Sequence, residues 1–342
     1  MQRRFARYAA VLLAVPLVLL TVQRAPQSVS VASKAPSAST VAQARANFIK
    51  DMSSHATAVG GGSWTSPGVE HAGKATAANG TVSEFPSYNW SGYADSESGT
   101  KTVTDVSGNW TMPSVTCPTA PYQNSDAFLA NWVGIDGFTD STVEQLGTGA
   151  QCFEGVTYYY VWYEMFPAGT VQEGTTACIT NNVNCPEPGD QISASVTVKP
   201  GSSGENDYTL SLTDHTRPWE SFSTTATCAT ATCVDSSGEW VVERPAVEPP
   251  FGIQIMPLPD FDRTSFSAGD IVSGGKYSTI QGFNDGSVYD MPMMDDTGSY
   301  YLACVDQPSR PGSLLSVTDT SACPTAAPTP SGGFETSWDA GF

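Results

Sequence analysis

Acidic and apolar residues alternate in the stretch GEWVVERP, residues 238–245. In an extended strand Glu239 and Glu243 point to one face, whereas Trp240 and Val242 point to the other. An acid pair of this kind is most often found on a solvated outer face. Two carboxyl groups on one face can also move protons to and from water during hydrolysis. The stretch therefore allows two interpretations, a solvated outer face or a strand that directs its acids to a functional site.

Another carboxyl group lies within an aromatic run, TYYYVWYEMF, residues 157–166. If this run is extended, Tyr160, Trp162 and Glu164 share one face with Phe166. Both faces are apolar enough to be covered, so we expect Glu164 to lie among aromatic side chains. Burial raises the pKa of a carboxyl group, and a neighbouring hydrogen-bond donor lowers it. Such a residue is either a structural acid or a catalytic one.

Short β-strands are the elements that must position these residues. Helical periodicity is nearly absent, and β-rich runs recur between Gly, Pro, Asn and Asp residues. The stronger candidates are TVTDVSGNWTM (102–112), TYYYVWYEMF (157–166), QISASVTV (191–198), DYTLSLTD (207–214), EWVVE (239–243), FGIQIMPL (251–258), KYSTIQGF (276–283), YYLACV (300–305) and, as a last edge strand, FETSW (334–338). Many strands without interleaved helices predict an all-β fold, a large two-sheet antiparallel β-sandwich.

The N-terminus has the pattern of an export signal. Three arginines precede an uncharged apolar run from Tyr8 to Gln23, which is short for a membrane span and contains Pro16. Small residues follow up to Ala32, so we expect residues 1–32 to be a signal peptide. The mature protein is then expected to be secreted and extracellular, with no membrane attachment after processing.

Charge divides the rest of the chain into two parts. Residues 1–82 carry eight Lys/Arg and two Asp/Glu, whereas residues 83–342 carry seven and 32. We expect residues 33–82 to be a basic pro-segment, removed from an acidic catalytic domain at 83–342 and inhibitory while attached. A disordered secreted linker is the alternative. The negative charge of the acidic domain argues against nucleic acid or an anionic membrane as a partner. We also expect the mature protein to be a monomer.

All eight cysteines lie in the acidic domain. An even count in an exported chain indicates disulfides. Spacing suggests the pairs Cys117–Cys152, Cys178–Cys185, Cys228–Cys233 and Cys304–Cys323, although spacing alone does not establish connectivity. A metal site is not expected, because there is no Cys-x-x-Cys pair and His215 is the only histidine of this domain. His215 lies in the turn-like stretch TDHTRP, and we expect it on the surface.

Five stretches together carry a resemblance to a known family. They are YNWSGYA (88–94), NWVGIDG (131–137), STVEQLGTG (141–149), YVWYEMFP (160–167) and GEWVVERP (238–245). The residues of these stretches and their order along the chain resemble the glutamic peptidases, or eqolisins, from about Asn89 to Pro245. The resemblance implies a secreted, acid-acting endopeptidase on a two-sheet sandwich related in shape to legume lectins and sandwich glucanases. It also implies polypeptide substrates and no cofactor.

The resemblance assigns roles to individual residues. It implies Gln145 and Glu243 as the catalytic pair, with Gln145 orienting water and Glu243 acting as base and then acid. It implies a supporting or substrate-binding role for Trp90, Trp132, Asp136, Trp162, Glu164 and Glu239. The chain departs from the family pattern in two places. The step from the GIDG loop to Gln145 is one residue shorter than in the fungal members, and Tyr160 replaces an aspartate.

Two other functions fit the same residues. A sandwich-fold glycoside hydrolase would use Glu164 and Glu243 as its carboxyl pair, at a separation that sets the stereochemical outcome. Such an enzyme would leave Gln145 without a role. A carbohydrate-binding module would stack sugars on Trp90, Trp110, Trp132 and Trp162, but aromatic residues are also common in sandwich cores.

Overall fold

The computed structural model describes most of the acidic domain. The described residues are 74–77, 80–118, 126–138, 140, 142–200, 206–228, 233–247, 254–284, 286–296, 301–306 and 328–338. The expected signal peptide and most of the expected pro-segment lie outside them. Within this part of the chain, no helix is long and apolar enough to cross a membrane.

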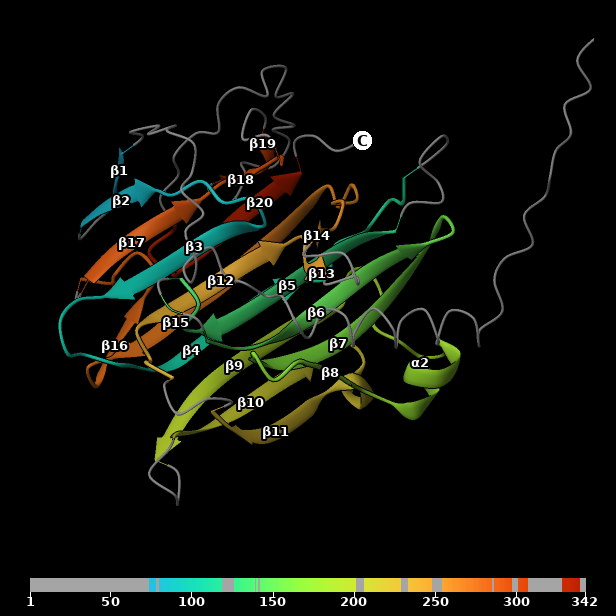
Figure 1. Cartoon of the computed structure of the whole chain (residues 1–342), viewed down its shortest axis with the longest axis horizontal. Coiled ribbons are helices and arrows are strands. Elements are labelled where there is room, and N and C mark those ends of the chain that lie inside the picture. Colours follow the sequence, from blue (N-terminus) through green and yellow to red (C-terminus); the bar gives the residue numbers. More distant parts are fainter. Residues whose placement is uncertain are drawn as a thin grey trace, which may run out of the picture. The chain divides into compact units, whose positions relative to one another are not determined.

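Two large sheets form the fold (Figure 1). Sheet A contains, in spatial order, β1 (Lys74–Ala77), β2 (Gly80–Glu84), β17 (Gly286–Met291), β3 (Trp90–Glu97), β12 (Ser237–Glu243), β5 (Ala127–Ile135), β6 (Val143–Phe153), β7 (Val156–Phe166) and β8 (Thr170–Glu173). Its neighbouring strands are antiparallel except β2 and β17, which run parallel. Strand β12 therefore lies in the middle of the sheet, between β3 and β5.

Sheet B packs against sheet A. It contains β11 (Phe222–Thr227), β10 (Asn206–Asp214), β9 (Gln191–Pro200), β4 (Val103–Thr111), β15 (Arg263–Ser273), β20 (Phe334–Trp338), β19 (Tyr301–Asp306) and β18 (Met293–Met294), with β16 (Lys276–Thr279) also paired to β15. The remaining elements are the two-stranded pair β13 (Ala246–Val247) and β14 (Gln254–Ile255), the short helix α2 (Thr176–Asn181) and the 3-10 turn η1 (Pro218–Glu220). The two-sheet, largely antiparallel fold predicted from the sequence is confirmed.

Each predicted run contains a strand, but two runs differ from expectation in detail. FGIQIMPL contributes only Gln254–Ile255 among its described residues. FETSW is not an edge strand, because β20 lies between β15 and β19 and pairs with both. Strands β1 and β2 also extend sheet A back to Lys74, within the range assigned to the pro-segment.

Sheet A is apolar on both faces. On one face, side chains such as Trp240, Val242 and Val133 join the core between the two sheets. On the other, Trp90, Trp132 and a further set of buried residues form a second apolar cluster: Ala94, Phe128, Ala130, Phe138, Val143, Tyr160, Trp162, Val241 and Met291. Strand alternation thus gives the sheet two different apolar surfaces. We call the face that carries the second cluster the outer face.

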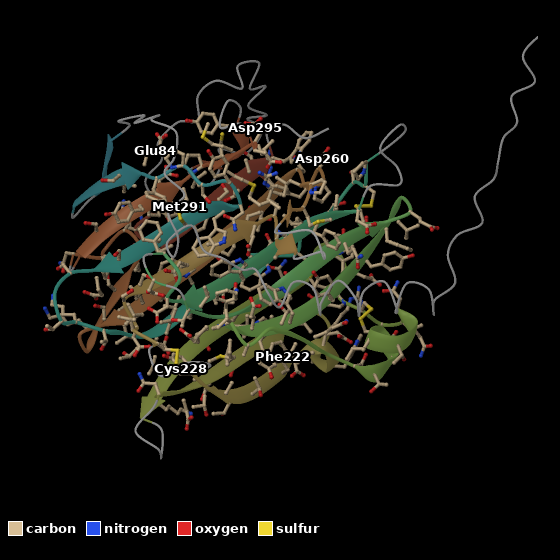
Figure 2. The ribbon with its side chains drawn as sticks, viewed as in Figure 1. Glu84, Phe222, Cys228, Asp260, Met291 and Asp295 are labelled. Carbon is tan, nitrogen blue, oxygen red and sulfur yellow. A yellow bond between two sulfur atoms is a disulfide. The ribbon has the colours of Figure 1, made fainter. Side chains whose placement is uncertain are left out.

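Three disulfides join neighbouring strands and loops. Cys117–Cys152 ties the segment after β4 to the end of β6, Cys178–Cys185 closes the loop of α2, and Cys228–Cys233 links the end of β11 to the approach to β12. Cys228 is labelled in Figure 2. These are three of the pairs that spacing suggested. Cys304 lies in β19, and its expected partner Cys323 lies outside the described residues.

Candidate active site

A row of paired residues crosses sheet A on the outer face. Glu239 of β12 pairs with Gly134 of β5, Gly134 pairs with Gln145 of β6, and Gln145 pairs with Glu164 of β7. Glu164 in turn pairs with Thr170 of β8. Residues paired across antiparallel strands point to the same face, so four polar side chains lie in line across five strands.

Glycine makes this row possible at its centre. A Cβ atom on Gly134 would lie 2.9 Å from the ring of Trp132 and 3.2 Å from Cβ of Gln145. The first distance is shorter than real Cβ contacts allow. The missing side chain therefore leaves room for the Trp132 indole beside Gln145.

Gln145 is held by the carboxyl group of Glu164. Its Nε2 donates to Oε2 of Glu164 at 2.8 Å, and the Thr170 hydroxyl donates to Oε1 of Glu164 at 3.1 Å. Gln145 and Glu164 are completely buried. The Oε1 atom of Gln145 has no hydrogen-bond partner among the described residues. The amide therefore keeps one unsatisfied acceptor, which is costly in a buried position.

Glu243 accepts hydrogen bonds from two side chains, one on β5 and one in the bend before β3. The Trp132 indole N–H donates to Oε2 at 2.8 Å, and the Asn89 amide donates to Oε1 at 3.2 Å. Trp90, next to Asn89, packs edge-on against Trp132 with ring centroids 4.9 Å apart. Both donors favour the ionised carboxylate, and Glu243 is buried beside these two indoles.

Burial dominates the protonation of the two glutamates. It raises the pKa of Glu243 to about 7, against the hydrogen bonds from Trp132 and Asn89. It raises the pKa of Glu164 to about 8, and the nearby charge of Glu243 adds to the rise while Thr170 and Gln145 oppose it. Gln145, Glu164 and Glu243 lie on the same face of sheet A, with Glu243 opposite Ala130 of β5, four residues along that strand from Gly134, the partner of Gln145.

Aromatic rings lie over glycines around this site. A Cβ atom on Gly149 would lie 2.2 Å from the ring of Tyr160, and one on Gly147 would lie 2.8 Å from Cβ of Trp132. Tyr160 and Trp162 are fully buried on the outer face, as the alternation of the aromatic run predicted. Tyr160, which stands where the family carries an aspartate, therefore contributes an aromatic ring over β6.

Asp136 anchors the approach to β12. One of its carboxylate oxygens accepts the backbone N–H groups of Val234 and Asp235, at 2.9 and 2.8 Å, and the other accepts that of Ser236 at 2.6 Å. Burial and the charge of Asp140 raise the pKa of Asp136 to about 7, although these three hydrogen bonds oppose the rise. Because Asp136 follows β5 directly, its carboxylate ties the start of β12 to the end of β5.

Glu239 lies at the end of the row in a different environment. It is completely buried, and neither carboxyl oxygen has a hydrogen-bond partner among the described residues. Burial raises its pKa well above the ordinary value, and the charges of Asp136, Asp140 and Asp95 add to the rise. Glu239 therefore favours the protonated, neutral form.

The predicted residues fall into two groups in the structure. Gln145, Glu164, Glu243, Trp90, Trp132, Trp162 and Glu239 all lie on the outer face. Asp136 instead bonds backbone groups of the loop before β12. Thr170 was not predicted to take part. Its role depends on the pairing of β7 with β8, which places it opposite Glu164. Asn89 lies within the motif YNWSGYA, but its bond to Glu243 could not be predicted from the sequence.

Other chemical possibilities find less support among the described residues. His215 is exposed and contacts the Ser193 hydroxyl at 2.8 Å, away from the outer face. Within the described ranges, no group of three or more His, Cys, Asp or Glu side chains is placed to hold a metal ion. The site that can perform chemistry is the one built from an amide and two carboxyl groups.

The structure is thus a β-sandwich in which carboxyl groups and an amide share one buried aromatic face. A sequence profile of the peptidase A4 family matches residues 88–306, which is more than half of the chain. The protein belongs to this family, and it is a glutamic-type endopeptidase.

Solved structures share the fold of this chain. Two crystal structures of scytalido-glutamic peptidase with transition-state analogues match with TM-scores of 0.52 and 0.51, at 18% and 17% identity. Each match covers 74% of this chain and all of the other. At this identity the likeness shows the fold. A search of curated proteins found no matching sequence.

The hydrogen bond from Trp132 is expected to hold down the pKa of Glu243. In a Trp132→Phe variant the carboxylate loses one donor, so its pKa should rise, by about one unit or more. The measurement is a pH titration of the Glu243 carboxyl carbon by NMR in labelled protein. Trp110→Phe is the matched control, because the Trp110 indole bonds Thr148 within the core between the sheets. Equal titration curves for both variants would contradict the prediction.

The buried Glu239 should make the fold less stable as pH rises. Its pKa is higher in the folded state than the reference value of about 4.3, so the folded protein binds the extra proton. The stabilisation is complete below about pH 4 and is lost as pH rises through the folded-state pKa. Glu239→Gln should therefore flatten the decline in the free energy of unfolding between pH 4 and pH 8, measured by urea denaturation.

The control for that experiment is Asp262→Asn, which removes one negative charge from an exposed position. If the unfolding free energy of Glu239→Gln declined with pH as steeply as that of the wild type, Glu239 would not be the proton-binding group.

Proposed function

We propose that the protein is a secreted, acid-active endopeptidase in which Gln145 and Glu243 activate water against a peptide bond, without a metal and without a covalent intermediate. The observation that carries this proposal is their position on one buried face, connected through Glu164. Gln145 bonds Glu164, and the charge of Glu243 acts on the same carboxyl group. A general base and an amide donor are thus available together.

Glu243 serves as the proton carrier. Its carboxylate, held by Trp132 and Asn89, takes a proton from water while the water oxygen bonds to the peptide carbon. The carbonyl oxygen then carries a negative charge. In the second step Glu243 gives the proton to the peptide nitrogen, the C–N bond breaks, and Glu243 is again a carboxylate. No atom of the protein becomes bonded to the substrate.

Gln145 is the hydrogen-bond donor to the carbonyl oxygen of the substrate peptide. An amide N–H aimed at that oxygen stabilises the charge that develops in the tetrahedral intermediate. A glutamine amide is neutral over the whole working range, so its donors do not titrate. A donor of this kind accounts for about 3–4 kcal/mol of the barrier in comparable sites.

Activity in acid follows from how Glu243 is held. Burial is the largest cause of its raised pKa. Water entering this face restores solvation of the carboxylate, and the donors Trp132 and Asn89 then favour the ionised form at lower pH. The working range therefore moves toward acid when the site is hydrated.

The rival glycosidase interpretation has less support. Glu164 and Glu243 are neighbouring carboxyl groups, but both oxygens of Glu164 already accept hydrogen bonds, from Gln145 and Thr170. A glycosidase acid or nucleophile needs a free oxygen at the sugar. The carbohydrate-binding interpretation required Trp110 to stack on a sugar, but Trp110 packs against Phe266 in the core between the sheets.

The remaining expectations belong to the same proposal. We propose export through residues 1–32, inhibition by the basic segment 33–82 while it is attached, and a monomeric mature enzyme. The charge difference between this segment and the acidic domain supports the inhibitory contact. The contact should weaken in acid, when carboxylates become protonated.

Removing either member of the pair should abolish proteolysis. Gln145→Ala and Glu243→Ala should each lower kcat on casein at pH 3–4 by about 10²-fold or more, with the fold retained. Gln151→Ala, on the same strand and face as Gln145, is the matched control and should stay active. Chelator should not change the wild-type rate. Activity retained in either pair variant would refute the proposed pair, and a lack of casein cleavage by the wild type would refute proteolysis.

Acid should release the basic segment. Secreted precursor brought to pH 3–4 should shorten to a form that begins near residue 83, as read by mass spectrometry. The Glu243→Ala precursor should remain intact under the same conditions if the protein processes itself. A wild-type precursor that stays intact at this pH would count against both release and self-processing.

A further inference from the structure

The unsatisfied oxygen of Gln145 poses a specific problem for the proposed chemistry. With Nε2 bonded to Glu164, the amide oxygen Oε1 is the atom left without a partner. An oxygen turned toward the substrate would repel the negative charge that forms on the peptide carbonyl. Only the remaining N–H of Nε2 could then serve that charge.

A protonated Glu164 resolves the problem. The side-chain amide can turn by 180° with little change in shape, and its hydrogen-bond partners decide which atom faces which way. A carboxylic acid can donate its O–H to Oε1 of Gln145. Both N–H groups of Gln145 are then free for the substrate, while Thr170 can still donate to the other oxygen of Glu164.

We propose that Glu164 is a positioning residue whose protonation sets the orientation of the Gln145 amide. As an acid it binds the amide oxygen and turns the N–H groups toward the substrate. As a carboxylate it binds an N–H group and turns the oxygen toward the substrate. Enzyme with protonated Glu164 is active, and enzyme with ionised Glu164 is impaired. The inference rests on the proposed function, since it assigns Gln145 the carbonyl oxygen.

The surroundings of Glu164 favour the proton. Glu243, from β12, is the charged group that acts on it, and Glu239 lies on the same strand at the end of the row. Strand β6 presents the neutral Gln145, β8 presents Thr170, and β5 has no titratable residue. Neither Glu164 nor Glu243 forms an ion pair with a basic side chain in the described ranges. A negative charge on Glu164 therefore lacks a counter-charge there.

Glu243 and Glu164 also differ in the pH at which they ionise. The pKa of Glu243 is raised to about 7 and that of Glu164 to about 8. Glu243 ionises at the lower pH of the two, and hydration of the face lowers its pKa further, so a carboxylate at Glu243 and an acid at Glu164, the combination that catalysis needs, coexist from acid pH up to the ionisation of Glu164. The acid limb of the pH profile then belongs to Glu243 and the alkaline limb to Glu164, with the coupling expected of neighbouring groups.

The test compares pH profiles of kcat/KM on a quenched fluorescent peptide, within the range where circular dichroism shows native protein. A glutamine at 164 donates an N–H to Gln145 at every pH and never ionises. Glu164→Gln should keep its acid-range kcat/KM within about tenfold of wild type, and its alkaline limb should move up by at least one pH unit. A uniform loss with an unmoved alkaline limb would show a merely structural role and overturn the inference.

Thr170→Val gives an independent and directional test. It removes the hydroxyl that donates to the Glu164 carboxylate and leaves Gln145 untouched. The pKa of Glu164 should rise, and the alkaline limb should move to higher pH by up to about one unit. A limb that stays in place, or moves to lower pH, would contradict the inference even if Glu164→Gln failed to fold.

A spectroscopic readout separates this inference from the proposed function. The side-chain amide of Gln145, followed by ¹⁵N–¹H NMR across pH, should shift with the ionisation of Glu164 in wild type and not in Glu164→Gln. Full activity of Gln145→Ala would refute the catalytic pair itself. A loss of activity in Gln145→Ala, together with an amide that does not respond to pH, would refute the orientation by Glu164 alone.

Discussion

Strand β12 pairs with a strand on each side, and its two faces carry different kinds of side chain. Trp240 and Val242 fill the core between the sheets, whereas Glu239 and Glu243 belong to the outer face. A shift of one residue against β3 or β5 would exchange the faces and bring both carboxyl groups into the core. Such a shift is opposed by full backbone pairing with β3 and β5 and by Gly92, where a Cβ atom would lie 2.0 Å from the Trp240 carbonyl oxygen. The positions of the other site residues relative to Glu239 and Glu243 depend on this register.

Among the residues that the structure describes, the acids of the outer face form no ion pairs with basic side chains. Arg244 follows Glu243 directly, but its guanidinium donates to the carbonyl of Tyr88 and to Asp296. In the described ranges the other arginine ion pairs are formed by Arg217 and Arg263 with acids outside the row. With no cation at the row, a bound proton is the available means of removing negative charge. Raised pKa values are therefore a consequence of the placement of basic residues as much as of burial.

Much of the site could be predicted where a local pattern determines it. The alternation of Tyr160, Trp162 and Glu164 fixes which side chains share a face, because a strand has a period of two. The short cysteine spacings predicted pairs that the structure contains, since a loop of a few residues leaves few alternatives. The family motifs identified the residues that the structure gathers on the outer face. These properties depend on near neighbours or on the order of motifs.

The order of strands in space could not be predicted in the same way. The place of β20 between β15 and β19 and the bond from Thr170 to Glu164 both depend on which strands meet. The role of Asp136 depends on a loop almost one hundred residues later in the chain. Nothing in the local sequence indicates these partners, because several strands of similar composition could pair at each edge.

Hydrogen-bond donors and neighbouring charges together distinguish the acids of the site. Asp136 accepts three backbone N–H groups and Glu243 accepts two side-chain N–H groups, and both have a pKa near 7. Glu164 also accepts two donors but faces the charge of Glu243, and its pKa is near 8. Glu239 has no hydrogen-bond partner within the described residues, and its pKa lies well above the ordinary value.

Burial raises the pKa of all four acids, and their donors and neighbouring charges then distinguish them. As pH rises, the first to ionise are the anchor of the β12 approach and the proposed base, whereas Glu164 and Glu239 keep their protons longer. One sheet face can in this way hold a carboxylate that accepts protons beside a carboxylic acid that donates a hydrogen bond. The proposed chemistry needs both forms at the same pH, and the separation requires no charged partner other than the acids themselves.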